Sequence, residues 1–317
     1  MDKVKKKLSK PDIKKKIRSL PEDKETKKII SKRSLPIKLS TDIVSKLKYS
    51  KFLLELIKEN PKYVPGRTIE KMFENCSINI NTKNLVGSGL TGNVYTLGKN
   101  TVIKRSKLYL GDFIPEAIIS MLLTKEVNDG NTIHFPKTYD INICQDVSYI
   151  KLERFIEFKL HSFKNILHNL FAQVCFALYF AQKKYKFRHN DFHYGNVMLK
   201  KTNLDIKYFN YKVEDQWYKI PNLGYAIVII DFGQSGIIYK HKKINYDDYL
   251  LYDITTFFET VNTSDYIEYI PEIFEDIINR QVKEKLVKEY FKQGLYSEYK
   301  VNKKWPFKNE YFSISFS

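Results

Sequence analysis

The chain has 317 residues, of which 43% are hydrophobic, and it carries a net charge of +18. This length and apolar content are enough for one large domain or two lobes around a sizeable core, so a wholly disordered chain is excluded. The longest apolar runs are far shorter than the roughly 20 residues that span a bilayer. The lysine-rich N-terminus has no apolar signal core behind it, so we expect no transmembrane segment and no secretion.

The cysteines predict a cellular compartment, and the basic residues are concentrated near the N-terminus. Three cysteines without a C-x-x-C pair are typical of free thiols in a reducing compartment, which predicts an intracellular location. Residues 1–50 hold 17 Lys and Arg against six Asp and Glu, so they carry +11 of the total charge. We expect residues 1–40 to be a disordered basic tail, which either solubilises the protein or binds an acidic partner, nucleic acid or an anionic membrane.

The next segment has a helical pattern. Apolar residues recur at helical spacing behind the cap signal Ser40-Thr41-Asp42, and the pattern ends near Pro61. We expect residues 41–80 to form a helical brace that precedes and packs on the following domain.

Strand and turn signals follow between Asn81 and Lys107, in the segments NLVGSGL, GNVYTLG and NTVIKRS. They predict three antiparallel strands. A helix is expected from about Pro115 to Glu126, because proline suits a first helical turn and the triplet NDG at 128–130 stops the helix. SYIKLERF predicts a further strand.

Helical patterns dominate the second half of the chain. A long helix is expected from Ser162 to about Lys183, followed later by a hairpin-like segment at Ile206–Ile220, the apolar strand YAIVIIDFG and a mostly helical remainder. We therefore predict an α+β fold of two lobes. Residues 81–153 form a small β-rich lobe, and residues 154–317 form a larger, mainly helical lobe.

A glycine-rich turn lies between the first two predicted strands. Residues 87–94, GSGLTGNV, fit the pattern G-x-G-x-x-G-x-V. A glycine turn between strands needs no ligand, and a dinucleotide-binding turn would require a helix next. Since strands flank it here, its backbone amides are expected to close over phosphates, as in a kinase-type loop.

Lys104 ends the strand that follows this turn, amid apolar residues. An ammonium group in that position is costly unless it meets phosphate and carboxylate groups, although a lysine at a strand end can also extend to solvent. Its expected partner is Glu116, on the core-facing side of the next helix. Glu126 is the alternative, but it lies at a helix end.

The stretch RHNDFHYGNVML, residues 188–199, allows three interpretations. His189 and His193 have the spacing of a zinc helix, but Asn190 replaces the glutamate of a zinc protease and a glycine follows. The second interpretation, a polar piece of the core, accounts for one of the two histidines at most and leaves Asp191 and Asn196 unexplained. The third interpretation is a catalytic loop, in which Asp191 accepts a proton from a hydroxyl and Asn196 holds a cation.

This third interpretation requires a second carboxylate on a later strand. Asp231, in the segment IIDFG, supplies it. Magnesium binds one or two carboxylate or amide oxygens together with phosphate oxygens, so Asn196 and Asp231 are the predicted metal ligands.

These motifs, in this order, resemble the eukaryotic-type protein kinase family over roughly Asn81 to Asn302. The segments DFHYGNV and YKIPNLGYAIVIIDFG resemble kinases of large DNA viruses, and D-x-H-x-G-N resembles haspin-like kinases. The resemblance implies a serine/threonine protein kinase that uses ATP and Mg²⁺, acts on a protein substrate and is a monomer. If it is viral, the host cytoplasm or the virion is its expected location.

The resemblance also assigns a role to each predicted site residue. Asp191 is the catalytic base, Asn196 and Asp231 bind magnesium, and Asp253 braces the catalytic loop. Lys104 and Glu116 form the phosphate-binding pair. The expected ATP-binding residues, with Leu152 as gatekeeper and Glu153 as first hinge residue, are Val86, Gly87, Gly89, Gly92, Val94, Lys104, Leu152 and Glu153.

Three departures from the family pattern qualify the resemblance. Asn190 replaces the arginine that pairs with a phosphorylated activation loop, so we expect no activation by that route. His193 replaces a lysine that helps to hold the γ-phosphate, and it can donate there with a pH-dependent charge. The activation segment is short, with about 20 residues between Gly233 and Asp253 and no A-P-E motif.

Two other functions stay open beside the protein kinase. A small-molecule kinase of the choline or aminoglycoside type resembles the H-N-D triplet, but the complete glycine loop and the glycine of D-F-G argue against it. A pseudokinase scaffold, binding partners through the basic tail, has no physical need for a base, a lysine and two metal ligands.

Overall fold

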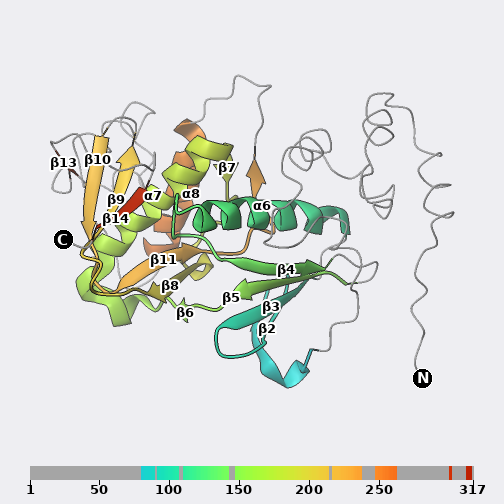
Figure 1. The fold of residues 1–317 in the computed structure, drawn as a ribbon. Helices are drawn as coiled ribbons and strands as arrows, with labels where there is room; N and C mark the ends of the chain where they lie inside the picture. The colour runs from blue at the N-terminus through green and yellow to red at the C-terminus, as the bar shows by residue number, and fades with distance from the viewer. Residues whose placement is uncertain are drawn as a thin grey trace, which may run out of the picture. The chain divides into compact units, whose positions relative to one another are not determined.

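The computed structural model describes residues 80–89, 91–106, 110–142, 147–213, 216–237, 247–262, 300–301 and 312–315 (Figure 1). The expected basic tail, residues 1–40, lies outside these described residues, as does the expected brace except for Ile80. The chain divides into two compact units. The first runs to Met121 and includes Thr138–Leu152, and the second holds Leu122–Lys137 and the chain from Glu153.

A five-stranded sheet dominates the first unit, and it contains the three strands that the sequence predicts. The strands run in the order β1-β2-β3-β5-β4, and β2 pairs antiparallel with both β1 and β3. Gly98 closes the β2–β3 turn with a positive φ of 133°, a conformation that glycine adopts without strain. The bounds are β1 (Leu85–Ser88), β2 (Gly92–Thr96), β3 (Thr101–Ser106), β4 (Thr138–Asn142) and β5 (Tyr149–Glu153), and a short 3-10 turn, η1 (Thr82–Asn84), precedes them.

Helix α6 (Leu110–Asn128) is longer than predicted. It begins five residues before the expected start, so Pro115 lies inside the helix rather than at its first position. Proline lacks a backbone N–H, and one bond of the helical ladder is therefore missing there. Every residue from Glu116 to Thr124 is buried, which explains why the sequence shows no polar face along this helix.

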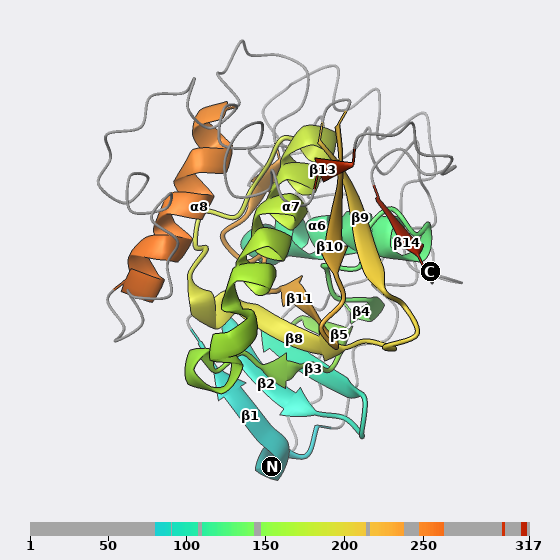
Figure 2. The ribbon, with the colours of Figure 1, turned by 90° about the vertical axis from the view of Figure 1, so that its left-hand side faces the viewer.

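Helix α7 (Leu167–Tyr185) forms the centre of the second unit. It follows a 3-10 segment, η2 (Leu160–Ile166), and most of its residues are buried. It packs against β11, β9 and β10 and against α8 (Asp247–Asn262), where Phe171 lies edge-on to Phe257 and Phe258. Figure 2 shows α7 beside β9 and β10.

The expectation that residues 154–317 are mainly helical is not met within the described residues. There, α7 and α8 are accompanied by nine strands in three sheets. A three-stranded sheet has the order β11-β8-β6, and a two-stranded sheet joins β12 to β7. The bounds are β6 (Ile156–Glu157), β7 (Phe187–Arg188), β8 (Val197–Lys201), β11 (Tyr225–Ile229) and β12 (Gly236–Ile237), with a 3-10 turn, η3 (Tyr194–Asn196), between β7 and β8.

The predicted hairpin is confirmed as β9 (Tyr208–Val213) and β10 (Gln216–Pro221). Two C-terminal strands that the sequence did not predict, β13 (Lys300–Val301) and β14 (Phe312–Ser315), extend it into a sheet of order β13-β10-β9-β14. β13 has two residues, fewer than the four that a strand pattern needs, and β14 has only the minimum of four, so neither gives a distinct sequence signal.

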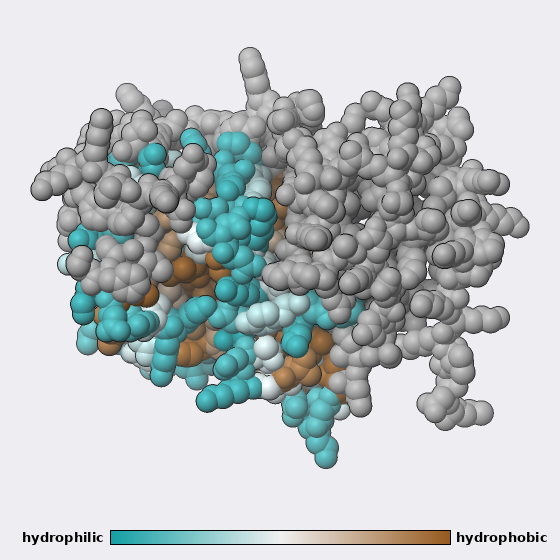
Figure 3. All heavy atoms as spheres, viewed as in Figure 1, coloured by the Kyte–Doolittle hydropathy of each residue, from teal (hydrophilic) through white to brown (hydrophobic). Residues whose placement is uncertain are grey.

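The apolar surface of the described residues is scattered. In the view of Figure 3, hydrophilic side chains break it into small patches. No helix among the residues that the structure describes is long and apolar enough to cross a membrane.

Candidate active site

The predicted glycine loop is a tight turn between β1 and β2. The Gly89 N–H donates to the Gly92 carbonyl at 2.9 Å and closes the turn. A Cβ atom at Gly92 would lie 2.5 Å from the Arg105 carbonyl oxygen, so only glycine allows β2 to pair this closely with β3. Val86 is 55% exposed and Val94 is half-buried, so both remain accessible on the strands that flank the turn.

Lys104 and Glu116 meet inside the first unit. Lys104 Nζ lies 2.6 Å from Glu116 Oε1, and both side chains are buried. Strand β3 supplies the lysine opposite Val94 of β2, and α6 supplies the glutamate. A buried ammonium group is tolerable here because the carboxylate compensates its lost hydration.

Glu126, the alternative partner of this lysine, has a different role. Its carboxylate accepts hydrogen bonds from Lys184 Nζ at 2.7 Å, from Asn131 Nδ2 at 2.7 Å and from the Tyr185 hydroxyl. These contacts hold the end of α6 against the end of α7.

The predicted catalytic loop follows α7 directly and is not helical. Lys186 ends the helix in a left-handed conformation, with φ of 54°, and β7 leads into His189. Residues 189–193 have no regular secondary structure, so the zinc-helix interpretation is wrong. The His189 ring is fully buried, and its Nε2 lies 2.9 Å from the Ile230 carbonyl oxygen.

Asp253 holds the backbone of this loop. Its two carboxylate oxygens accept hydrogen bonds from the His189 N–H at 2.7 Å and the Asn190 N–H at 3.0 Å. The carboxyl group is 2% exposed, and burial raises its pKa to about 6, although both backbone bonds and the nearby Arg188 act in the opposite direction. The contact lies where the resemblance places the loop-bracing aspartate.

Asp191 and Asn196 are linked by a hydrogen bond. Asn196 Nδ2 donates to the Asp191 carbonyl oxygen at 2.8 Å, while the Asp191 side chain is exposed. Because the amide nitrogen is occupied, its partner Oδ1 is oriented as the acceptor that is left for a cation. The same asparagine accepts the Ile230 N–H at its backbone oxygen, at 3.0 Å.

Asp231 therefore follows directly on a residue that is bonded to Asn196. Its φ is 62°, a left-handed conformation that costs free energy for a residue other than glycine and that concentrates at functional sites. An amide oxygen and a carboxylate are hard oxygen donors, which suits Mg²⁺. The structure thus brings the predicted base and both predicted metal ligands to one end of the β8–β11 pair.

His193 and Asn190 occupy the positions that depart from the kinase pattern. The His193 ring is half-buried and packs close to Gly195, where a Cβ atom would lie 2.9 Å from the ring. Asn190 Nδ2 donates to the Gln234 carbonyl oxygen at 2.8 Å, three residues beyond Asp231. Asparagine at this position therefore holds the start of the expected activation segment directly.

The predicted hinge has a partner that the sequence did not indicate. The Glu153 N–H donates to the Lys137 carbonyl at 2.9 Å, and its Oε1 accepts from Lys200 Nζ on β8 at 2.6 Å. Leu152, the expected gatekeeper, is half-buried at the end of β5. Lys200 lies 47 positions from Glu153 in the sequence, so no local pattern could have identified the pair.

The site residues divide between the two units. The glycine loop, Leu152, Lys104 and Glu116 belong to the first unit, and Glu153, Asp191, His193, Asn196 and Asp231 belong to the second.

Comparison with known proteins shows what the chain is similar to. Relatives include a protein of Acanthamoeba polyphaga mimivirus whose name provisionally gives it as a serine/threonine-protein kinase, 24% identical over 62% of this chain and 42% of its own length. The mouse serine/threonine-protein kinase haspin is 40% identical over 23% of this chain and 9% of its own length. A protein of Invertebrate iridescent virus 6 is 29% identical over 38% of this chain and 20% of its own length. This chain therefore spans less than half the length of the relatives it matches.

The family match is more extensive than any of these pairwise similarities. Residues 1–267 match the family described as "Haspin like kinase domain". This range includes the glycine loop, the buried Lys104–Glu116 pair, the catalytic loop and Asp253. The chain belongs to the haspin-like kinase family.

Proposed function

We propose that the protein transfers the γ-phosphoryl group of ATP to serine or threonine hydroxyls of a protein, in a two-lobed kinase fold. The first unit would serve as the ATP-covering lobe and the second as the catalytic lobe. The observation that carries the proposal is the hydrogen bond from Asn196 Nδ2 to the Asp191 carbonyl oxygen, 2.8 Å long. It links the proposed proton acceptor and the proposed cation ligand within one loop, which supports phosphoryl transfer.

In this mechanism Asp191 accepts the proton of the attacking hydroxyl. The hydroxyl oxygen forms a bond to the γ-phosphorus, the bond from that phosphorus to the β–γ bridging oxygen breaks, and ADP leaves. Asp191 suits the role because its carboxylate is exposed while its backbone is held through Asn196. Proton acceptance by a positioned side chain contributes about 10²- to 10⁴-fold to such reactions.

Asn196 and Asp231 would hold magnesium. When bound, Mg²⁺ would neutralise charge on the phosphate oxygens. The asparagine presents its Oδ1 because Nδ2 is occupied, and Asp231 is held next to it by the bond between Ile230 and Asn196.

Lys104 would bind the ATP phosphates, with Glu116 holding its ammonium group in place. The 2.6 Å contact supports this role, because it orients an otherwise flexible side chain before the nucleotide arrives. The glycine turn at Gly87–Gly92 would present backbone N–H groups to the same phosphates, and the Glu153 backbone would meet the adenine.

A further proposal concerns activation. The Asn190 amide already holds the Gln234 carbonyl oxygen, so the protein would be active without phosphorylation of its activation segment. The basic tail, residues 1–40, is proposed to bind an acidic partner or nucleic acid, and the monomeric state and the intracellular location stay predictions.

The test is transfer of radiolabelled phosphate from ATP in the presence of Mg²⁺. The wild type and Asp191→Asn would be compared on four acceptors: a basic protein, an acidic protein, choline and an aminoglycoside. We expect labelling of protein serine or threonine that the variant loses. Labelling of choline or the aminoglycoside alone would instead establish a small-molecule kinase, and ATP binding without any transfer would establish a scaffold.

A further inference from the structure

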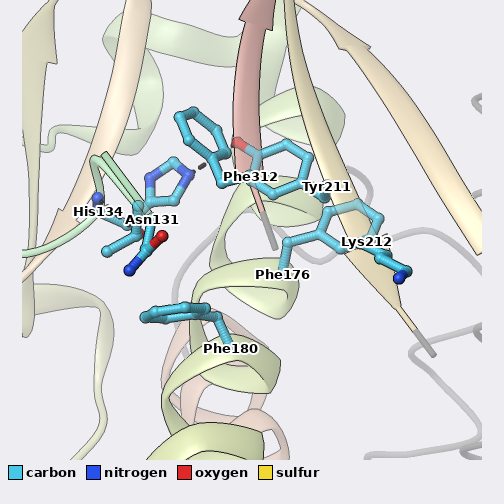
Figure 4. Close-up of a pocket in the computed structure, with 8 residues that line it drawn as sticks. Asn131, His134, Phe176, Phe180, Tyr211, Lys212 and Phe312 are labelled. Carbon is cyan, nitrogen blue, oxygen red and sulfur yellow. Dashed lines mark hydrogen bonds between the residues drawn. The ribbon is translucent and has the colours of Figure 1, made fainter. Parts of the chain in front are cut away.

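The hairpin of β9 and β10, called the insertion hairpin below, and the C-terminal strand β14 surround a buried histidine. Strand β14 pairs antiparallel with β9, and Phe312 lies opposite Tyr211. Both rings pack against His134, which lies in the segment between α6 and β4 and is 1% exposed. Figure 4 shows the three side chains converging from separate parts of the chain, with Phe176 of α7 stacked on Tyr211.

Both ring nitrogens of His134 are engaged. Nδ1 lies 2.9 Å from the Ile227 carbonyl oxygen, and Nε2 lies 2.7 Å from the Tyr211 hydroxyl. A carbonyl oxygen can only accept, so Nδ1 must carry the proton. In a neutral ring Nε2 is then the acceptor, and Tyr211 donates to it. The Ile227 carbonyl therefore sets the tautomer, and the Tyr211 hydroxyl satisfies Nε2 and holds the ring in the orientation in which Nδ1 bonds to Ile227.

The carbonyl that His134 binds belongs to an edge strand. In its sheet, β11 pairs only with β8. Its other edge would present unpaired backbone groups in a buried environment, and such groups cost free energy unless they find partners. Two residues, Gln173 and His134, supply them. Gln173 of α7 accepts the Ile227 N–H at 3.1 Å, and His134 donates to the Ile227 carbonyl while its own backbone oxygen accepts the Ile229 N–H at 2.9 Å.

Strand β11 leads directly to the predicted metal ligand. It ends at Ile229, Ile230 bonds to Asn196, and Asp231 follows in its left-handed conformation. A shift of β11 along or away from β8 would therefore move Asp231. The chain from His134 to Asp231 consists of direct hydrogen bonds and one covalent backbone segment.

We infer that the insertion hairpin and the C-terminal strand form a positioning device for the active site. Tyr211 and Phe312 hold His134, His134 holds the free edge of β11, and β11 sets the place of Asp231. Tyr211 and His134 are positioning residues, since neither is proposed to touch the substrate or the metal. This inference rests on the proposed function for its catalytic consequence, but not for its structural one.

The cavity beside His134 is too small to suggest a ligand instead. It is lined by Asn131, Thr132, Phe180, Lys212 and the four residues described above. It has room for about one water molecule. The aromatic cluster is thus a nearly filled contact.

The test is Tyr211→Phe in the full chain, which removes only the hydroxyl that binds His134. Tyr208→Phe is the matched control, because it makes the same change on β9 but lies on the opposite face of that strand. The Tyr208 ring contacts Lys219, which phenylalanine can still do. Phe312→Leu is a second variant that loosens the ring contact without removing β14.

The first measurement is amide hydrogen exchange of the segment 225–233. Loss of one buried hydrogen bond should speed local opening by about five-fold in Tyr211→Phe, and Phe312→Leu should act in the same direction. Tyr208→Phe should match the wild type. Unchanged exchange in both variants would overturn the inference, whether or not the protein is a kinase.

The second measurement separates positioning from simple stabilisation. The assay is run well below the unfolding temperature. There, kcat for phosphoryl transfer should fall by about five-fold in Tyr211→Phe, while KM for ATP should change by less than about two-fold. The reason is that the displaced carboxylate of Asp231 is proposed to act mainly in the transition state. Faster exchange with an unchanged kcat would overturn the link to Asp231. If the wild type transfers no phosphate, the proposed function fails, and the exchange measurement alone decides the structural part.

Discussion

Acidification from pH 7 to pH 5 should destabilise the protein because two buried histidines resist protonation. His134 and His189 are both fully buried, and burial lowers the pKa of each to about 4 from the ordinary 6.5, against the raising effect of bonds to the Ile227 and Ile230 carbonyls. Unfolding exposes both rings, which then bind protons near pH 6.5. The unfolded state therefore binds more protons between pH 6.5 and pH 4, so stability is lost as the pH falls through this range.

Asp253 acts in the opposite direction. Burial raises its pKa to about 6 from 3.8, so the folded state binds the extra proton between those values. Between pH 7 and pH 5, each histidine should lower the free energy of unfolding by about 2 kcal/mol. Asp253 should raise it by about 1 kcal/mol over the same range. The net loss from these three groups is on the order of 2 to 3 kcal/mol.

Urea unfolding at both pH values measures this effect. His134→Gln replaces the ring by a group that stays neutral, so its loss between pH 7 and pH 5 should be smaller than that of the wild type by about 2 kcal/mol. His161→Gln makes the same change at an exposed position and serves as the control. An identical pH dependence in the wild type and His134→Gln would refute the reasoning, because His134 could not then be buried and neutral.

Three further variants test separate parts of the site. Asn196→Ala should raise the Mg²⁺ concentration for half-maximal phosphoryl transfer by about 10- to 100-fold, measured by magnesium titration at saturating ATP; an unchanged titration would remove Asn196 from the metal site. Lys104→Met leaves a buried carboxylate without its ammonium partner and should cost about 3 to 5 kcal/mol in urea unfolding. Adding Glu116→Leu should recover most of that loss, and no recovery would mean that the two residues are not coupled. Lys200→Met should raise KM for ATP by about three-fold with kcat unchanged, since a partly exposed ion pair is worth up to about 1 kcal/mol. Lys201→Met, at the exposed neighbouring position, is the control, and equal effects of the two variants would contradict the hinge contact.

Local patterns were sufficient to predict the strands and the loop that hold the predicted site residues. The strands around the glycine turn have alternating apolar residues and glycine punctuation, and both signals lie within a few positions of each other. The pairing of Lys104 with Glu116 followed from one physical constraint, because a buried ammonium group needs a carboxylate on the nearest core-facing helix. The predicted catalytic loop could be singled out because its residues are contiguous in the sequence.

Contacts between distant parts of the chain could not be predicted in this way. His134 and Ile227 are 93 positions apart, and β14 is a four-residue strand whose pairing with β9 depends on the folded second unit. The predicted start of α6 was wrong because proline is favoured in a first turn, whereas here the helix continues on both sides of Pro115, with Phe113 and Glu116 both buried. Each of these features depends on packing between parts of the folded chain, and the local sequence carries little information about that packing.

The most direct test of the central claim compares wild type and Asp191→Asn in single-turnover phosphoryl transfer to a protein acceptor, with ATP affinity measured in parallel. The asparagine keeps the side-chain shape and the backbone carbonyl that Asn196 binds, but it is a far weaker proton acceptor. We expect the rate to fall by about 10²- to 10⁴-fold while the ATP dissociation constant stays within about two-fold of the wild-type value. Equal transfer rates in the two proteins would contradict the assignment of Asp191 as the catalytic base.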